Sequence, residues 1–149
     1  MKPFKYKLSS VLKLREFEKQ KIENQLSVLN KEILEINQQI LNLQQSILNL
    51  QSNLNQAGEN GNLDLGMIKY FPEFLSASEK EIANLTEELE VKQSEREKTL
   101  KLLDESMAKV KILENDKIRK QKSYKFKRQK KENLDIEDMQ IILRGRGSA

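Results

Sequence analysis

Apolar residues recur along residues 22–54 in steps that alternate strictly between four and three positions. This spacing fills positions a and d of successive heptads, the pattern of a helix that packs along another helix. The a positions are Leu26, Ile33, Ile40, Ile47 and Leu54, and the d positions are Ile22, Leu29, Ile36, Leu43 and Leu50. Traced backwards, the register passes Lys19 and Arg15 and regains Leu12 and Leu8. The pattern predicts a first helix over about residues 5–56.

Three more leucines, Leu34, Leu41 and Leu48, recur at heptad position b. A seam between two helices needs only positions a and d, so these leucines are surplus to it. We expect a neighbouring helix to cover them in part. The alternative is an exposed strip on which a partner docks.

A cluster of helix-breaking residues at 57–62 predicts a turn over about residues 57–66. Asp64 is a candidate N-cap for the next helix, while Ser76 and Ser78 each begin a candidate capping box. The start of the second helix therefore falls between Asp64 and Ser76, and we take about residue 67, with a kink at Pro72. The helix is expected to reach about residue 143 and to be followed by a disordered tail, 144–149.

The apolar pattern of the second helix is less regular than that of the first. It includes Leu75, Ile82, Leu85 and Leu89, meets Lys92 and Arg96, and resumes at Leu100, Leu103, Met107 and Val110. The eleven-residue step from Leu89 to Leu100 resembles a four-residue stutter in the heptad.

Two long helices joined by one turn predict an all-α fold, an antiparallel two-helix coiled-coil hairpin with a longer second helix, as a single domain over residues 1–149. A turn near residue 62 places Ile22 opposite about residue 102 and Leu8 opposite about residue 116. The second helix then continues beyond the first over residues 117–143, roughly 40 Å of helix.

Composition removes several classes of chemistry. The chain of 149 residues has no Cys and no His, which leaves no zinc ligand set, thiolate nucleophile or imidazole base. No phosphate-binding glycine loop is present. We therefore expect no enzyme, no cofactor and no small-molecule substrate. Because no apolar run is long enough to cross a membrane, we expect a cytoplasmic protein.

The net charge of +4 is unevenly distributed. Residues 59–116 carry 8 basic and 14 acidic groups, whereas residues 117–149 carry 11 basic and 4 acidic groups. Nine of those basic residues fall between positions 117 and 131, interleaved with Tyr124 and Phe126. We rank docking on an acidic protein surface above a solvated helix face, and both above binding of nucleic acid.

The N-terminus reads Phe4-x-Tyr6-x-Leu8-x-x-Val11-Leu12-x-Leu14-Arg15-Glu16, and the region after the turn contains Tyr70-Phe71-Pro72-Glu73-Phe74. Residues 128–135 read Arg-Gln-Lys-Lys-Glu-Asn-Leu-Asp. In this order, the motifs resemble the FliJ family, the small coiled-coil proteins of the bacterial flagellar type III export apparatus. The resemblance covers essentially the whole chain.

The resemblance implies three partners: the hexameric flagellar export ATPase, the cytoplasmic part of the membrane export-gate protein, and the chaperones of export substrates. It also implies a peripheral association with the inner membrane at the flagellar basal body, in a process that serves motility. The alternatives are the equivalent stalk protein of a virulence type III secretion system and a basic coiled-coil protein that binds nucleic acid.

The resemblance also implies site residues. The end that docks on the ATPase would contain Phe4, Tyr6, Arg15, Lys120, Lys125, Lys127, Arg128, Lys130 and Lys131. The patch that faces the export gate would contain Gln39, Leu43, Leu50, Phe74 and Ser78. Leu43 and Leu50 are also d positions, so a place in the seam is the alternative for both.

Overall fold

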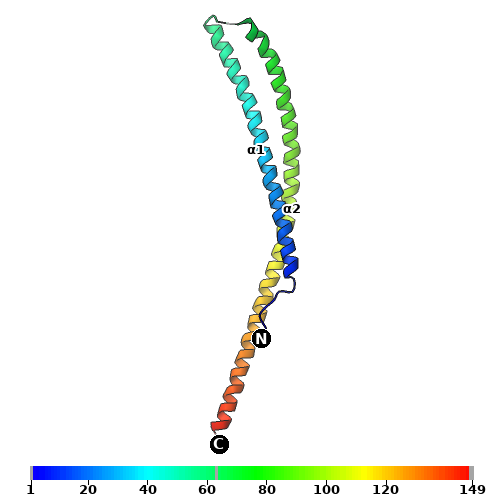
Figure 1. Ribbon diagram of the computed structural model, residues 1–149, viewed down its shortest axis with the longest axis vertical. Coiled ribbons are helices and arrows are strands. Elements are labelled where there is room, and N and C mark those ends of the chain that lie inside the picture. Colours follow the sequence, from blue (N-terminus) through cyan, green and yellow to red (C-terminus); the bar gives the residue numbers. More distant parts are fainter. Residues whose placement is uncertain (1, 63, 148–149) are drawn as a thin grey trace. The chain divides into compact units, whose positions relative to one another are not determined.

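A computed structural model describes residues 2–62 and 64–147 of the chain. Two α-helices make up the fold (Figure 1): α1 spans Ser9–Glu59 and α2 spans Leu65–Gly147. The described residues contain no strand. The predicted fold class is thus confirmed, because the chain is all-helical, its two helices pack against each other, and the second is the longer.

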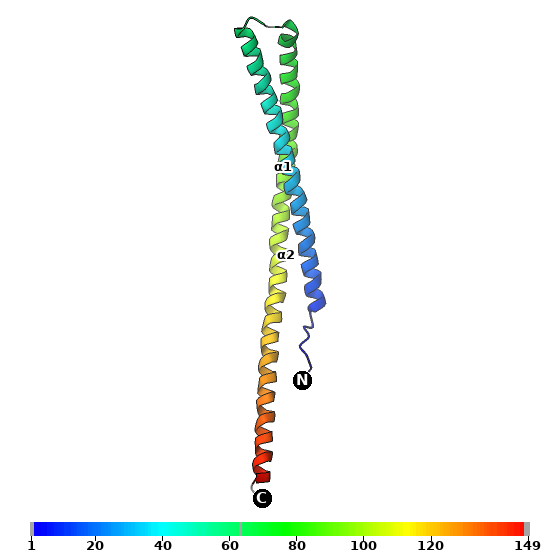
Figure 2. The same cartoon turned by 60° about the vertical axis from the view of Figure 1, so that its left-hand side comes forward.

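The chain divides into two compact units. Residues 1–21 and 103–149 form one, which we call the terminal unit, and residues 22–102 form the other, the loop unit. Within each unit a stretch of α1 runs antiparallel to a stretch of α2 (Figures 1 and 2). In the loop unit Glu32 pairs with Lys92, and in the terminal unit Tyr6 pairs with Asp116. This is the register expected for a turn near residue 62.

The turn is held by caps on both sides. Gly61 has a φ of 73°, a left-handed conformation that glycine adopts without steric cost. It allows Asn62 N to donate to Ala57 O (2.8 Å) and Gly61 N to donate to Gly58 O (3.3 Å), which satisfies the last carbonyls of α1. Asp64 Oδ1 then accepts from Gly66 N (3.0 Å). Asp64 is therefore the N-cap of α2, which begins at Leu65.

Both ends of the chain differ from the prediction. α1 begins at Ser9 rather than near residue 5, because Phe4, Tyr6 and Leu8 alternate with Lys5 and Lys7, a period of two that does not form one face of a helix. α2 continues to Gly147, so residues 144–147 are helical rather than a disordered tail. Residues 148–149 of that predicted tail lie outside the described residues. Pro72 lies inside α2, and a kink there stays a prediction.

The predicted seam of α1 is confirmed. All ten a and d residues from Ile22 to Leu54 are buried or half-buried, with Ile36 the most deeply buried. The same register extends back to Leu12, which packs with Val110 in the core of the terminal unit. Leu8 lies before the helix and is exposed. The strict alternation of steps therefore identified the packed face of α1 correctly.

The seam of α2 contains polar residues and no stutter. Its inward positions follow steps of four and three without a fault, and all but Arg96 are buried or half-buried: Phe71, Leu75, Ser78, Ile82, Leu85, Leu89, Lys92, Arg96, Thr99, Leu103, Ser106, Val110 and Leu113. Met107, which the stutter would have placed inside, is exposed. The predicted stutter is wrong. Thr99 and Ser106 interrupt the apolar pattern but are buried, so the heptad continues through them.

The leucines at position b of α1 are exposed. Leu34, Leu41 and Leu48 keep 69%, 53% and 62% of their surface. The interpretation in which a neighbouring helix covers them is therefore wrong, because α2 packs on the a and d positions and on neighbours such as Asn30 and Glu32, and leaves position b exposed. They form a line of apolar side chains along the outer face of the loop unit, which we call the leucine strip.

Candidate functional site

Charge separates the two units. The terminal unit carries 20 basic and 10 acidic residues, and the loop unit carries 7 basic and 13 acidic residues. Most of the basic excess of the terminal unit comes from the run in α2 between positions 117 and 131. The terminal unit therefore presents a positive potential that favours acidic partners.

Residues 2–8 pack against α2 at the start of this basic run. Phe4 and Tyr6 contact α2, while Lys5 and Lys7 are exposed. The Tyr6 hydroxyl donates to Asp116 Oδ2 at 2.6 Å. The N-terminal segment therefore packs on α2 through its two aromatic side chains.

Tyr124 fixes the far end of this segment. Its ring lies 5.6 Å from the ring of Phe4, and its hydroxyl donates to the backbone carbonyl of Lys2. Phe4 in turn packs against the buried core of the terminal unit. The portion of α2 that extends beyond the N-terminal segment thus begins after Tyr124, and not at Lys117 as predicted.

Asp116 organises the basic residues around it. It accepts from Tyr6 and lies 3.4 Å from Arg119 and 3.5 Å from Lys120, whose ammonium stands 5.7 Å from the centre of the Tyr6 ring. The Tyr6 hydrogen bond, followed by the two cations, lowers the pKa of Asp116. The same bond, together with burial, raises the pKa of Tyr6 to about 12. Tyr6 and Asp116 are therefore a coupled pair that anchors the N-terminal segment.

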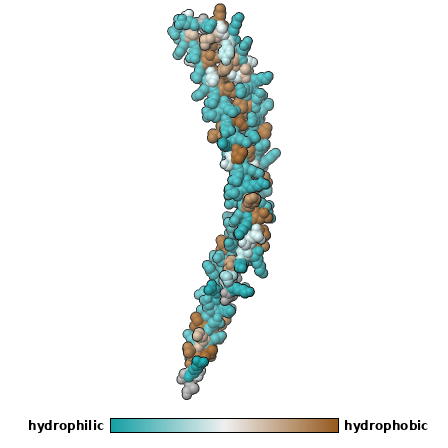
Figure 3. All heavy atoms as spheres, in the orientation of Figure 1, coloured by the Kyte–Doolittle hydropathy of each residue, from teal (hydrophilic) through white to brown (hydrophobic). Residues whose placement is uncertain are grey.

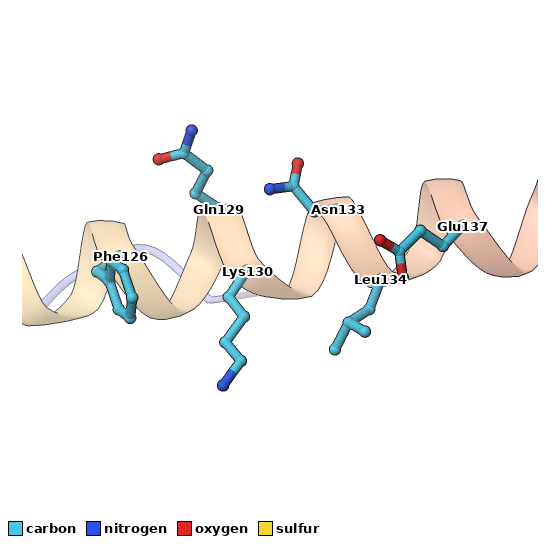
Figure 4. A pocket seen from close by; sticks show the side chains of 6 residues that line it. All are labelled: Phe126, Gln129, Lys130, Asn133, Leu134 and Glu137. Carbon is cyan, nitrogen blue, oxygen red and sulfur yellow. The ribbon is translucent and has the colours of Figure 1, made fainter.

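Beyond Tyr124 every residue of α2 up to Arg146 is exposed. We call residues 125–146 the exposed arm. Arg128 pairs with Glu132 within the arm, at 3.3 Å. Figure 4 shows one of its faces, where Lys130 and Leu134 project to one side of the helix and Gln129 and Asn133 to the other. The arm thus offers cationic and apolar side chains together.

Apolar side chains gather toward the end of the exposed arm. The space-filling view shows a brown patch near the C-terminal end of α2 (Figure 3). The exposed large apolar residues there are Leu134, Ile136, Met139, Ile141, Ile142 and Leu143. A helix of this length that buries no side chain gains nothing from tertiary packing. The arm therefore has the properties of a segment that a partner covers.

The residues predicted for ATPase docking fall into two groups. Phe4, Tyr6 and Lys120 meet around Asp116 and Tyr124, and Tyr6 is buried there. The residues at 125–131 lie on the exposed arm: Lys125, Lys127, Arg128, Lys130 and Lys131. Arg15 belongs to neither group, and its guanidinium pairs with Glu18 at 3.1 Å. The arm residues are the ones whose side chains are accessible to a partner.

The sequence analysis did not single out Asp116 or the role of Tyr124. The signal that could have found Asp116 was the predicted register, which placed residue 116 opposite the N-terminal segment. The alternation of Phe4 and Tyr6 with Lys5 and Lys7 was the signal that this segment does not continue the helix. Together they predict that aromatic side chains of the segment meet polar residues of α2 near position 116.

The arrangement of the two helices and the positions of the quoted motifs agree with one family. The profile of the family described as Flagellar FliJ protein matches residues 4–146, which is nearly the whole chain. The chain belongs to the FliJ family. Searches among curated proteins and among solved structures gave no match. Membership makes the chain a flagellar export-related protein. Neither helix, in the part of the chain that the structure describes, has a stretch apolar and long enough to cross a membrane.

The patch that the FliJ resemblance assigns to the export gate lies in the loop unit. Gln39 is exposed, Leu43, Leu50 and Phe74 are half-buried, and Ser78 keeps only 4% of its surface. Phe74 also stacks on the exposed ring of Tyr70, with 5.7 Å between centroids. The gate-facing role of these residues stays a prediction, and Gln39 and the Tyr70–Phe74 pair are its accessible part.

Proposed function

We propose that this FliJ-family chain is a non-enzymatic adaptor of the flagellar type III export apparatus that docks by its terminal unit on the hexameric export ATPase. The observation that supports docking is the exposed arm, which carries four lysines and Arg128 between positions 125 and 131, all of them exposed. Attraction between this arm and an acidic surface is long-ranged and weakens with added salt. We expect the bound arm to lie between the ATPase subunits.

The loop unit serves a different partner in this proposal. Its acidic character and its accessible Gln39, Tyr70 and Phe74 suit a contact with the cytoplasmic part of the export gate. Chaperones of export substrates bind the same chain, which brings cargo to the gate. The protein would thus work in the cytoplasm, peripherally associated with the inner membrane at the flagellar base, and couple ATPase to gate without chemistry of its own.

The test is the hydrolysis rate of the purified cognate export ATPase, titrated with the chain at low ATPase concentration. We expect a saturable rise in rate, accompanied by larger ATPase oligomers in light scattering. The variant K125Q/K127Q/K130Q/K131Q should raise the half-maximal concentration about tenfold or more and reduce its dependence on salt. These four lysines are exposed, so the helix itself should be retained.

A matched control removes the same charge elsewhere. The variant K31Q/K69Q/K80Q/K98Q neutralises four exposed lysines of the loop unit and should stimulate the ATPase as the unmodified chain does. Equal weakening by both variants would show that only net charge matters, and no stimulation by the unmodified chain would contradict ATPase coupling altogether.

A further inference from the structure

The leucine strip has an unusual setting for such a highly charged chain. Leu34, Leu41 and Leu48 are exposed at seven-residue intervals, which is about 10.5 Å along the helix. From residue 36 to residue 58 the sequence has no charged residue, although 34% of the whole chain is charged. The side chains that flank the strip on the helix surface are amides, among them Asn37, Gln38, Gln44 and Gln45.

This surface is complementary to itself. If two copies face each other about a two-fold axis at Leu41, Leu34 of each copy lies opposite Leu48 of the other, and the amides between them meet amides. Closed two-fold pairs use the same patch on both partners, as this arrangement does. Asparagine and glutamine side chains both donate and accept hydrogen bonds, so they can pair with their own kind.

Charge selects the direction of the pairing. Lys31 and Glu35, on either side of Leu34, are the exposed charged residues at this end of the strip, since Glu32 is half-buried and pairs with Lys92, and no charged residue follows until Glu59. In a parallel pair Lys31 would face Lys31 and Glu35 would face Glu35, which repels. In an antiparallel pair both residues face the uncharged stretch, since Lys31 comes opposite Gln51 of the second copy.

We infer that the loop unit pairs with a second copy of this chain, antiparallel, through the leucine strip. Each copy contributes one leucine per heptad, half the apolar content of a coiled-coil seam. The buried area is thus small and the dimer is weak, forming in roughly the 10–500 μM range. Each loop unit carries 13 acidic and 7 basic residues, so salt screens their mutual repulsion and strengthens the pair.

This inference does not depend on the export role, and the two fail separately. Sedimentation equilibrium of the full chain should show the mass rising from one chain, 17.4 kDa, toward two as concentration increases, and rising further with salt. The variant L34Q/L41Q/L48Q should remain monomeric at the same concentrations. The control L14Q/L102Q/L134Q changes three leucines that are 53%, 50% and 50% exposed elsewhere and should associate as the unmodified chain does.

The direction of pairing has its own test because the chain contains no cysteine. Under mild oxidation Leu41→Cys should give a disulfide-linked dimer. Leu34→Cys and Leu48→Cys, made with tags of different length, should cross-link to each other when mixed and not to themselves. Efficient cross-linking of Leu34→Cys alone would overturn the antiparallel arrangement. A chain that stays monomeric at all concentrations, or a glutamine variant that still dimerises, would overturn the pairing.

Discussion

One hydrogen bond joins the hydroxyl of Tyr6 to the carboxylate of Asp116 and shifts their two pKa values in opposite directions. The bond raises the pKa of Tyr6 from 10.0 to about 12 and lowers that of Asp116 below 3.8. Its contribution to stability is therefore complete between about pH 4 and pH 10. It is lost as pH rises from 10 to about 12 and as pH falls below 3.8.

Tyrosine absorbance at 295 nm, followed against pH, tests this pair. The chain has three tyrosines and no tryptophan, so the signal belongs to Tyr6, Tyr70 and Tyr124. We expect a delayed step near pH 12 that Tyr6→Phe removes. Tyr70→Phe, which changes an exposed ring in the loop unit, should keep that step. A delayed step that survives Tyr6→Phe would mean that the hydrogen bond to Asp116 does not hold in solution.

Polar residues in the loop-unit seam are paired across it. Lys92 Nζ lies 2.8 Å from Glu32 Oε2, and Arg96 Nε donates to Asn30 Oδ1 at 2.6 Å. The hydrogen bond from Lys92 to Glu32 raises the pKa of Lys92 above its ordinary value of 10.5. The stability that the pair contributes is therefore complete below pH 10.5 and is lost as the pH rises through the raised pKa of Lys92. Such partly exposed pairs add little stability, but they match one residue of α1 to one of α2.

At the scale of the helix, α1 was predictable and α2 was predictable only in part. The seam of α1 is built from aliphatic residues at every a and d position between Ile22 and Leu54, so periodicity alone located it. The seam of α2 includes Lys92, Arg96, Thr99 and Ser106, which a search for apolar periodicity treats as a break. Lys92 and Arg96 have partners on the other helix, and the Thr99 hydroxyl donates to the carbonyl of Glu95; a search for apolar residues detects none of these contacts.

The candidate site was predictable to a similar extent. The basic run itself was evident from composition, and residues 125–131 are exposed as a docking role requires. The burial of Tyr6 and Ser78 was not evident, because it depends on which residues of the opposite helix stand beside them. Exposure of the leucine strip likewise followed only from the packed pair.

Replacing Ile40 and Ile47 with Asp tests the seam of α1. Both side chains are half-buried on the packed face, so each substitution removes apolar contacts and leaves a carboxylate without a partner. We expect a loss of about 3 kcal/mol or more per substitution in the free energy of unfolding. Thermal unfolding by circular dichroism, at low protein concentration, measures it.

The matched control adds the same two charges to the outer face. Gln38→Asp with Gln45→Asp changes exposed residues two positions away and should cost less than about 1 kcal/mol in total. Equal destabilisation by the two double variants would contradict the assigned register of α1.

At the scale of the whole molecule, the segment proposed to dock is separate from the packed segments that stabilise the fold. The residues of the exposed arm are exposed, and Arg128 pairs with Glu132 inside the arm. We expect a chain that ends at Tyr124 to keep its free energy of unfolding within about 0.5 kcal/mol in urea titrations, while losing helical signal in proportion to the residues removed.

Removal of residues 2–8 is the complementary change. It takes away Phe4 and Tyr6, which pack on the core of the terminal unit, and should lower stability while leaving the arm intact. A large loss of stability on removal of the arm instead would mean that the arm folds back on the helices in solution.

The leucine strip also bears on which face of α1 packs against α2. Each strip leucine follows an a residue, so turning α1 by about 100° would bring Leu34, Leu41 and Leu48 inward in place of Ile33, Ile40 and Ile47. The same turn would replace the d residues Ile36, Leu43 and Leu50 by Asn37, Gln44 and Gln51. Three amides would then be buried against an apolar wall. These amides are exposed in the native packing. The cost of burying them therefore disfavours the rotation of α1 that would bury the leucine strip.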